Sequence, residues 1–144
     1  MRTLVVVVVG ILGGVAGALQ SQALGLMEQR AGTINSVFVT YAGGGVAAGL
    51  LLLATGGGRL RDLESVPWWA FTAGLMGLVI VGTLGIAVDR LGLGAGLTLF
   101  TGATLVSAAA IERTGWFGEI APLDGRRLAG IGLVVLGTWL VVGR

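Results

Sequence analysis

Long stretches without a charged residue are the feature that most limits what this chain can fold into. Five such runs, of 25, 28, 24, 21 and 16 residues, cover most of the sequence: Thr3–Met27, Ala31–Gly58, Ser65–Val88, Leu91–Ile111 and Leu128–Gly143. A bilayer core about 30 Å thick needs roughly 20 helical residues, so the first four runs are long enough to cross it. The fifth is short, and flanking arginines that reach the headgroups would complete it. The sequence therefore predicts an all-α, polytopic membrane protein with five transmembrane helices.

Turn-forming and interfacial residues set the expected ends of these helices. Gly56-Gly57-Gly58 closes the second run, and Pro67-Trp68-Trp69 opens the third with residues typical of a first helical turn and of a membrane interface. We expect a single transmembrane domain, 1–144, with helices at about 3–27, 34–55, 67–88, 93–111 and 127–143. The amino terminus also fits a signal peptide with a small-residue cleavage pattern at Ala16-Gly17-Ala18, but its run continues to Met27, which favours a spanning helix.

Composition excludes several classes of function. Only 11% of the residues are charged, whereas soluble domains carry about 25%. The nine basic residues are all arginines scattered over the loops, so we expect no nucleic-acid partner. The chain has no Cys and no His, and therefore no thiolate or imidazole metal site, no Cys or His nucleophile and no Ser-His-Asp triad. We expect a protein that is not an enzyme and that holds no metal or cofactor.

Polar residues inside the apolar runs are the candidate functional groups. A buried amide without a partner costs about 2–7 kcal/mol, so such side chains should face protein or water. Gln20 follows Gly13 and Gly17 on one helical face, whereas Gln22 lies about 200° away. In the fourth helix, hydroxyl residues recur at every third position, where they either line a cavity or return their protons to backbone carbonyls: Thr98, Thr101, Thr104 and Ser107. No acidic residue lies in the middle of a run, so no proton-coupling carboxylate is expected.

Glycine makes up 28 of the 144 residues, and many glycines lie within the runs. Several pairs are spaced four apart on one helical face: Gly10/Gly14, Gly13/Gly17, Gly45/Gly49 and Gly92/Gly96. Lipid provides no hydrophobic drive between helices, so small residues that allow close backbone approach are how such helices gain packing contacts. We interpret most of these glycines as packing residues.

The order of several short motifs resembles one known family. Gly13-Gly14 precedes Ala18-Leu19-Gln20, Thr40-Tyr41-Ala42-Gly43-Gly44 follows in the second helix, and the later motifs appear in the same order: Pro67-Trp68-Trp69 before Gly74-Leu75-Met76-Gly77, then Leu91-Gly92, then Gly130–Gly137 with Trp139-Leu140-Val141. This pattern resembles the YdcZ-like family of the drug/metabolite transporter superfamily, short proteins of the bacterial inner membrane. The chain departs from the family where it reads Gln22 in place of an Asn and Ala103-Thr104 in place of a Gly-Gln pair. Small multidrug resistance proteins are similar in size but have four helices and an acidic residue in the first.

The resemblance implies half of a ten-helix transporter. In full-length members of the superfamily two such halves are inverted repeats, so a five-helix chain would pair with a second copy or a homologue in the opposite orientation. Loop arginines favour a cytoplasmic amino terminus, with six on that side and three on the other: Arg2, Arg59, Arg61, Arg113, Arg126 and Arg127 against Arg30, Arg90 and Arg144. An antiparallel homodimer is the first expectation and a heterodimer the second.

The leading hypothesis is therefore a secondary transporter, an exporter of a small metabolite or drug-like compound that works by alternating access. Gln20 would be the main substrate-binding group, supported by Gln22 and Thr40, with the wall of the site shaped by three further residues: Tyr41, Thr101 and Thr104. Spans without charge suit a neutral or zwitterionic substrate. A non-transporting scaffold or accessory subunit is the alternative, and a pore is less favoured because no ring of charged side chains lies within a span.

Overall fold

The computed structural model describes residues 2–58, 60–114 and 124–143. These residues form five long helices and no strand: α1 (Arg2–Ala31), α2 (Thr33–Ala54), α3 (Ala73–Leu91), α4 (Leu93–Thr114) and α5 (Gly125–Val142). Two short 3-10 helices, η1 (Leu60–Ser65) and η2 (Trp68–Thr72), connect α2 to α3. Each long helix, with η2 counted as part of the third span, is long and apolar enough to cross a membrane, which confirms the predicted all-α fold with five spans.

The first helix continues beyond the apolar run that defines it in the sequence. Residues 27–31 read Met-Glu-Gln-Arg-Ala, all strong helix formers, so α1 ends only at Gly32, whose φ of 79° suits glycine. Asn35 of α2 donates a hydrogen bond from Nδ2 to the carbonyl oxygen of Ala31 at 2.8 Å, which satisfies one of the last carbonyls of α1. Glu28 therefore lies within a transmembrane helix and not in a loop.

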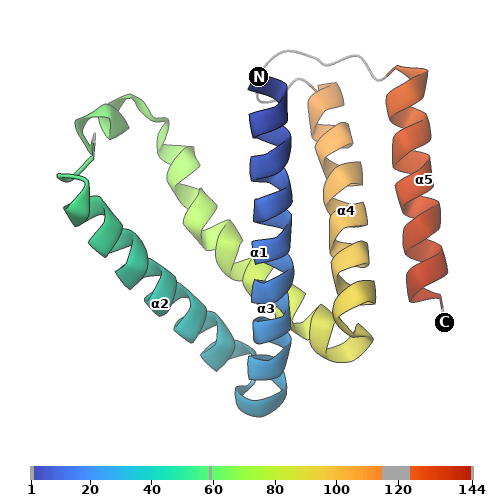
Figure 1. Ribbon diagram of the computed structural model, residues 1–144, viewed down its shortest axis with the longest axis horizontal. Coiled ribbons are helices and arrows are strands. Elements are labelled where there is room, and N and C mark those ends of the chain that lie inside the picture. The colour runs from blue at the N-terminus through green and yellow to red at the C-terminus, as the bar shows by residue number, and fades with distance from the viewer. Residues whose placement is uncertain (1, 59, 115–123, 144) are drawn as a thin grey trace.

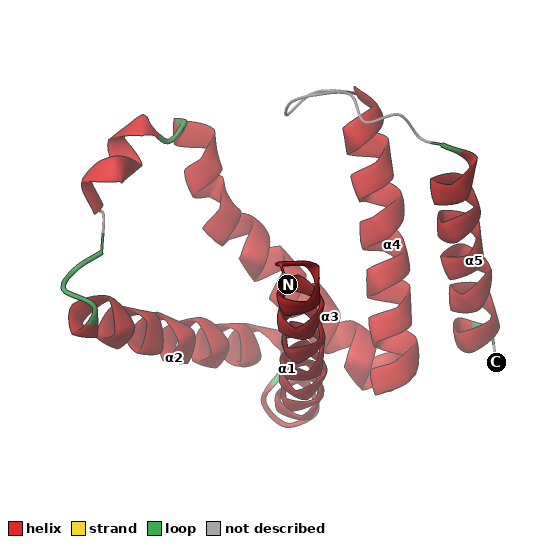
Figure 2. Ribbon diagram, turned by 45° about the horizontal axis from the view of Figure 1, so that its top comes forward, coloured by secondary structure: helices red, strands yellow, loops and turns green. Residues whose placement is uncertain are grey.

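The helices are arranged around α3, which packs against α1, α2 and α4, while α5 packs on α4 (Figure 1). The α1–α2 and α3–α4 connections lie together at the end of the molecule opposite the amino terminus, and α2 leans away from α1 and α4 (Figures 1 and 2). The two ends of the chain lie at opposite ends of the bundle, as an odd number of spans requires. Arg59 and Arg144, used in the count of loop arginines, lie outside the described residues.

Apolar side chains cover the surface, and small or polar residues fill the contacts between helices. The largest fully buried side chains are Leu24, Ser21 and Ser36, whereas most Val, Leu and Ile residues of the helices are exposed. The accessible surface is 10962 Å², but a compact soluble monomer of this mass would expose about 6,900 Å². An apolar surface this large needs lipid or another protein chain to cover it.

Candidate functional site

A groove between α1, α3 and α4 brings together two of the residues expected to bind substrate. The groove, here called the Gln20 groove, has a volume of about 390 Å³. Three helices contribute its lining residues, α1, α3 and α4 in that order: Gly14, Gly17, Ala18, Gln20, Ser21 and Leu24; Ile80, Val81 and Leu84; Leu97, Phe100 and Thr101. No charged side chain is among these lining residues.

Gln20 and Thr101 are the polar side chains available to a ligand in this groove. Gln20 lies on α1 and Thr101 on α4, both residues are exposed, and within the described part of the chain neither side chain makes a hydrogen bond. The third polar residue, Ser21, donates from Oγ to the carbonyl oxygen of Gly17 at 2.7 Å, so its proton is already engaged. An apolar groove with an amide and a hydroxyl on facing helices is the composition typical of small-molecule sites.

The other four expected site residues lie elsewhere. Gln22 is exposed on a different face of α1. Thr40 and Thr104 donate their hydroxyl protons to carbonyl oxygens one turn earlier, those of Ser36 and Phe100, each at 2.8 Å. Tyr41 packs from α2 against Gly77 of α3, so closely that a Cβ at Gly77 would require the Tyr41 hydroxyl to move. The groove of one chain therefore includes only two of the six residues.

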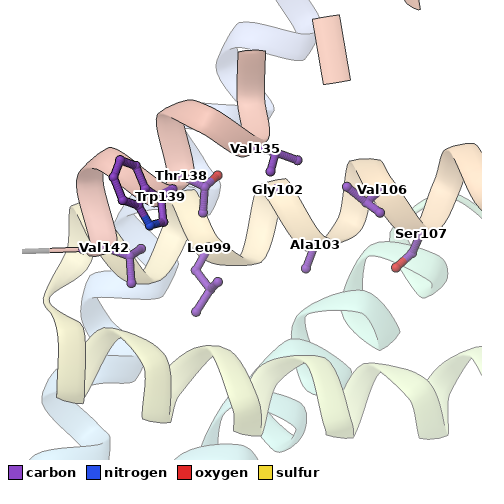
Figure 3. A pocket seen from close by; sticks show the side chains of 10 residues that line it. Leu99, Gly102, Ala103, Val106, Ser107, Val135, Thr138, Trp139 and Val142 are labelled. Carbon is purple, nitrogen blue, oxygen red and sulfur yellow. The ribbon is translucent and has the colours of Figure 1, made fainter. Parts of the chain in front are cut away.

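The repeating hydroxyl residues of α4 do not line one cavity. Thr98, like Thr104, returns its hydroxyl to its own helix, at 2.7 Å from the carbonyl oxygen of Gly94, and Thr101 faces the Gln20 groove. Ser107 lines a second hollow of about 580 Å³ between α4 and α5, shown in Figure 3. A spacing of three residues drifts by about 60° per step around a helix, so the row divides between two faces.

The α4–α5 hollow is larger than the Gln20 groove, and its lining is the more strongly apolar of the two. Thr138 of α5 has its hydroxyl engaged with the carbonyl oxygen of Val134 at 2.8 Å and lies 3.4 Å from that of Thr98. The remaining walls are mainly aliphatic, with Leu99, Val106 and Val142 among them (Figure 3). We interpret this hollow as a surface for lipid or for a neighbouring helix, and the Gln20 groove as the candidate substrate site.

Glycines determine how closely the walls of the Gln20 groove approach each other. An added Cβ at Gly96 of α4 would lie 3.0 Å from the backbone of Ala87 and Val88 in α3, and one at Gly25 of α1 would lie 2.6 Å from Cγ1 of Val88. Gly96 was expected to pack, but Gly10, Gly13, Gly14 and Gly17 have open space beside them. No side chain or backbone of a neighbouring helix therefore contacts the glycine face predicted for α1 within one chain.

Sequence reasoning missed the polar residues at the corner where α1, α2 and α3 meet. Ser36 is fully buried there, and Glu28 accepts a hydrogen bond from the Thr33 hydroxyl at 2.5 Å. The Ser36 hydroxyl lies 3.3 Å from Glu28 Oε2, but its shorter bond, 2.9 Å, is to the carbonyl oxygen of Thr33. The N-cap of α2 is Gly32, and no side chain caps this helix end. The signal was present in the helix-forming residues 27–31, which carry Glu28 into the helix.

Together, the five long apolar helices define a multi-pass integral membrane protein, and the Gln20 groove is its candidate site. The sequence matches, over residues 5–140, the family described as "Putative inner membrane exporter, YdcZ". The match covers nearly the whole chain, so the chain belongs to the YdcZ family, which confirms the resemblance, and it is a multi-pass protein of the inner membrane. The family description is that of a transporter and not of an enzyme. Comparisons with curated proteins and with solved structures gave no match.

Proposed function

We propose that this protein is a secondary active exporter of a small neutral or zwitterionic compound, which it binds in the Gln20 groove. The observation that carries the proposal is the pair of unpartnered polar groups, Gln20 and Thr101, on facing walls of an otherwise apolar groove. Its volume, about 390 Å³, falls within the range of roughly 300–1,000 Å³ that is usual for ligand sites. Because no charged side chain lines the groove, a bare ion would have no counter-charge there.

The proposed exporter works as a dimer of two chains in opposite orientations. Five spans put the two ends of a chain on opposite sides of the membrane, so an inverted second copy would complete the ten-helix arrangement needed for alternating access. The accessible surface exceeds that of a compact monomer by about 4,000 Å², while a standard interface covers about 800 Å² on each partner. Gly10 and Gly13 of α1, which have open space beside them and lie outside the Gln20 groove, offer a place where a partner helix can approach closely.

In such a dimer, the other four expected site residues would contribute to substrate binding only on surfaces shared with the partner: Gln22, Thr40, Tyr41 and Thr104. Their side chains lie outside the Gln20 groove of their own chain. Gln20 and Thr101 are therefore the primary binding groups in the proposal, and the other four are secondary.

Binding can be tested before the substrate is known. A panel of amino acids, nucleosides, sugars and neutral drug-like compounds is screened for thermal stabilisation of the purified protein, since a ligand at 100 times its Kd stabilises the folded state by about 2.7 kcal/mol. Each hit is then tested for flux in vesicles with the wild type, Gln20→Ala and Gln22→Ala. Loss of one neutral hydrogen bond, worth about 0.5–1.5 kcal/mol, predicts an affinity about 2- to 12-fold weaker for Gln20→Ala only.

The same experiment separates transport from a scaffolding role. A transporter with Gln20→Ala stays folded and assembled while flux falls, whereas a scaffold loses assembly and stability together. If Gln20→Ala and Gln22→Ala weaken ligand binding equally, the groove is not the binding site.

Orientation requires a separate test, for which the absence of native Cys is convenient. A single Cys is added after Gly143, and its labelling by a membrane-impermeant thiol reagent is measured in cells before and after permeabilisation. Labelling of about half the molecules before permeabilisation is the result that an antiparallel homodimer predicts. Labelling confined to one side contradicts the homodimer and favours a heterodimer with an oppositely oriented homologue.

A further inference from the structure

A second groove between α4 and α5 is apolar along its length and charged at one end. This groove, here called the Arg127 groove, has a volume of about 420 Å³ and shares no lining residue with the hollow of Figure 3. Its two charged residues lie where α4 ends and α5 begins (Figure 1). The lining residues come from α4 and then from α5: Leu105, Ala108, Ala109 and Glu112; Arg127, Gly130, Ile131 and Val134.

Small residues keep the Arg127 groove open. Ala108 and Ala109 line it from α4, and Gly130 lines it from α5, where an added Cβ would have nothing within 4 Å. Elsewhere the same two helices meet closely, since an added Cβ at Gly102 would lie 2.6 Å from Oγ1 of Thr138. The contact between α4 and α5 is therefore close at Gly102 and leaves space beside Gly130 that no described residue fills.

The charged end of this groove lies at the depth of the lipid headgroups. Helix α5 has 18 residues and is about 27 Å long, so it only just crosses the bilayer core, and Arg127 is its third residue. From Arg127 to Val134 the groove follows α5 for seven residues, or about 10 Å. That length is about a third of the bilayer core, so the groove can hold the upper part of an acyl chain whose headgroup lies beside Arg127.

The charges at this end of α4 and α5 suit an anion. Asp124 is the N-cap of α5 and accepts from the backbone N–H of Arg127 at 2.8 Å, so its carboxylate is engaged with the helix end. Glu112 lies 3.6 Å from Nη1 of Arg127, a loose ion pair between two half-exposed side chains. A guanidinium has five N–H donors, so Arg127 can bind a phosphate while Glu112 stays nearby. The described residues of these two helix ends include three arginines and two acids: Arg113, Arg126 and Arg127 against Glu112 and Asp124.

We propose that the Arg127 groove binds one anionic glycerophospholipid, with the phosphate on Arg127 and one acyl chain along Gly130, Ile131 and Val134. Arginine donates paired hydrogen bonds to phosphate oxygens, and basic pockets between transmembrane helices are suited to anionic headgroups. The acyl chain covers the apolar residues that α4 and α5 leave open to each other. A helix of a second protein chain fits this groove less well, because it would bury the Glu112–Arg127 pair away from water, whereas a lipid keeps both charges at the interface.

The test uses a lipid probe that reports this groove separately from the rest of the surface. The purified full chain is placed in phosphatidylcholine vesicles that contain a graded, small fraction of phosphatidylglycerol with a photoactivatable diazirine in one acyl chain. After illumination, mass spectrometry measures crosslinks to residues 105–112 and 127–134, and their yield gives the fraction of probe that half-saturates the groove. A phosphatidylcholine probe with the same acyl chains is the comparison. The phosphatidylglycerol probe should saturate the groove at the lower fraction.

Three charge variants test the headgroup contact. Arg127→Gln removes a hydrogen bond to a charged group and should raise the half-saturating fraction of phosphatidylglycerol at least about tenfold. Arg126→Gln is the matched control, because it removes the same charge from the same turn but does not line the groove. Its effect should stay below about fivefold, as for an exposed charge. Glu112→Gln removes a carboxylate beside the bound phosphate and should lower the half-saturating fraction.

Two glycine variants test the acyl-chain contact. Gly130→Leu places a side chain in the groove and should abolish the crosslinks to both segments. Gly132→Leu is the matched control, since Gly132 also has nothing within 4 Å of an added Cβ but lies outside the groove. Circular dichroism confirms that each variant is folded, and the two arginine variants test the site even if a leucine variant is not.

Several outcomes would overturn the inference. Equal effects of Arg126→Gln and Arg127→Gln would mean that the surface attracts anionic lipid only through its overall charge. Equal saturation by the two probes would mean that the groove does not select the headgroup. Crosslinks that persist in folded Gly130→Leu would place the lipid elsewhere, and a change of oligomeric state in that variant without loss of crosslinks would make the groove an interface between chains. None of these results bears on the ligand panel, which tests the export function separately.

Discussion

Replacing Gly96 by alanine should destabilise the bundle where α4 rests on the backbone of α3. The added Cβ would lie 3.0 Å from the carbonyl carbon and oxygen of Ala87 and from the amide nitrogen of Val88. These are backbone atoms of a neighbouring helix, so no side-chain rotation can relieve the contact, and α4 must move away. Gly94 is the matched control, because it lies on the same helix two residues earlier and has nothing within 4 Å of an added Cβ.

The magnitude follows from two opposing terms. Alanine in place of glycine stabilises a helix interior by about 1 kcal/mol; both glycines lie in the first turn of α4, so the gain is smaller there and similar for Gly94→Ala and Gly96→Ala. Overpacking a close contact costs about 1–3 kcal/mol and applies only to Gly96→Ala. Gly94→Ala should therefore be neutral or slightly stabilising, and Gly96→Ala should be less stable than Gly94→Ala by about 1–3 kcal/mol.

The assay is unfolding of the purified protein by dodecyl sulfate titrated into dodecyl maltoside micelles, followed by circular dichroism. Equal free energies of unfolding for Gly94→Ala and Gly96→Ala would refute the reasoning, because they would mean that α3 and α4 do not approach through Gly96. Since Leu97, Phe100 and Thr101 follow Gly96 on α4 and line the Gln20 groove, the same substitution should also weaken ligand binding.

Two further predictions concern how α5 is held against α4. Thr138→Val removes the contact of the Thr138 hydroxyl with the carbonyl oxygen of Thr98, 3.4 Å away. The free energy of unfolding should fall by about 0.6 kcal/mol, the average for such interhelical bonds. A loss above about 2 kcal/mol would contradict this estimate. Glu112→Gln breaks the 3.6 Å ion pair with Arg127; the Glu112 side chain is 51% exposed and that of Arg127 56%. The free energy of unfolding in the same micelles should therefore change by less than about 1 kcal/mol, and the change should vanish in high salt.

The corner at Glu28 illustrates why part of the candidate site could not be predicted. The acidic residue ended an apolar run, which led to a predicted first helix that stopped before it, but a charge ends a hydropathy signal without ending a helix. The helix-forming residues at 27–31 carry Glu28 into α1, and the position of Gly32 then turns α2 back beside it. Only the folded chain shows that α3 passes close to this carboxylate at Gly85, where an added Cβ would lie 3.6 Å from Oε2 of Glu28.

The polar residues of the spans show the same limit. Helical geometry predicted that Gln20 and Gln22 lie on different faces of α1. It did not predict which helices each of these faces would contact. Thr101 and Thr104 have the same side chain and are three residues apart on α4. Thr101 nevertheless lies in the groove, whereas the Thr104 hydroxyl bonds to its own helix. Which hydroxyl is free for a ligand depends on how α4 is rotated against α1 and α3.

The sequence by itself determined the membrane environment, the five spans and the family of this protein. Run length, hydropathy and motif order can all be read along the chain, without knowing which distant residues meet. The tertiary structure decided which residues meet: Gln20 with Thr101 across a groove, and Glu28 with Thr33, Ser36 and Gly85 at a corner. In lipid the apolar faces of the helices are nearly equivalent, so helix rotation and crossing depend on a few close contacts at glycines and hydroxyls. Those contacts join segments far apart in the sequence, and only the folded chain reveals them.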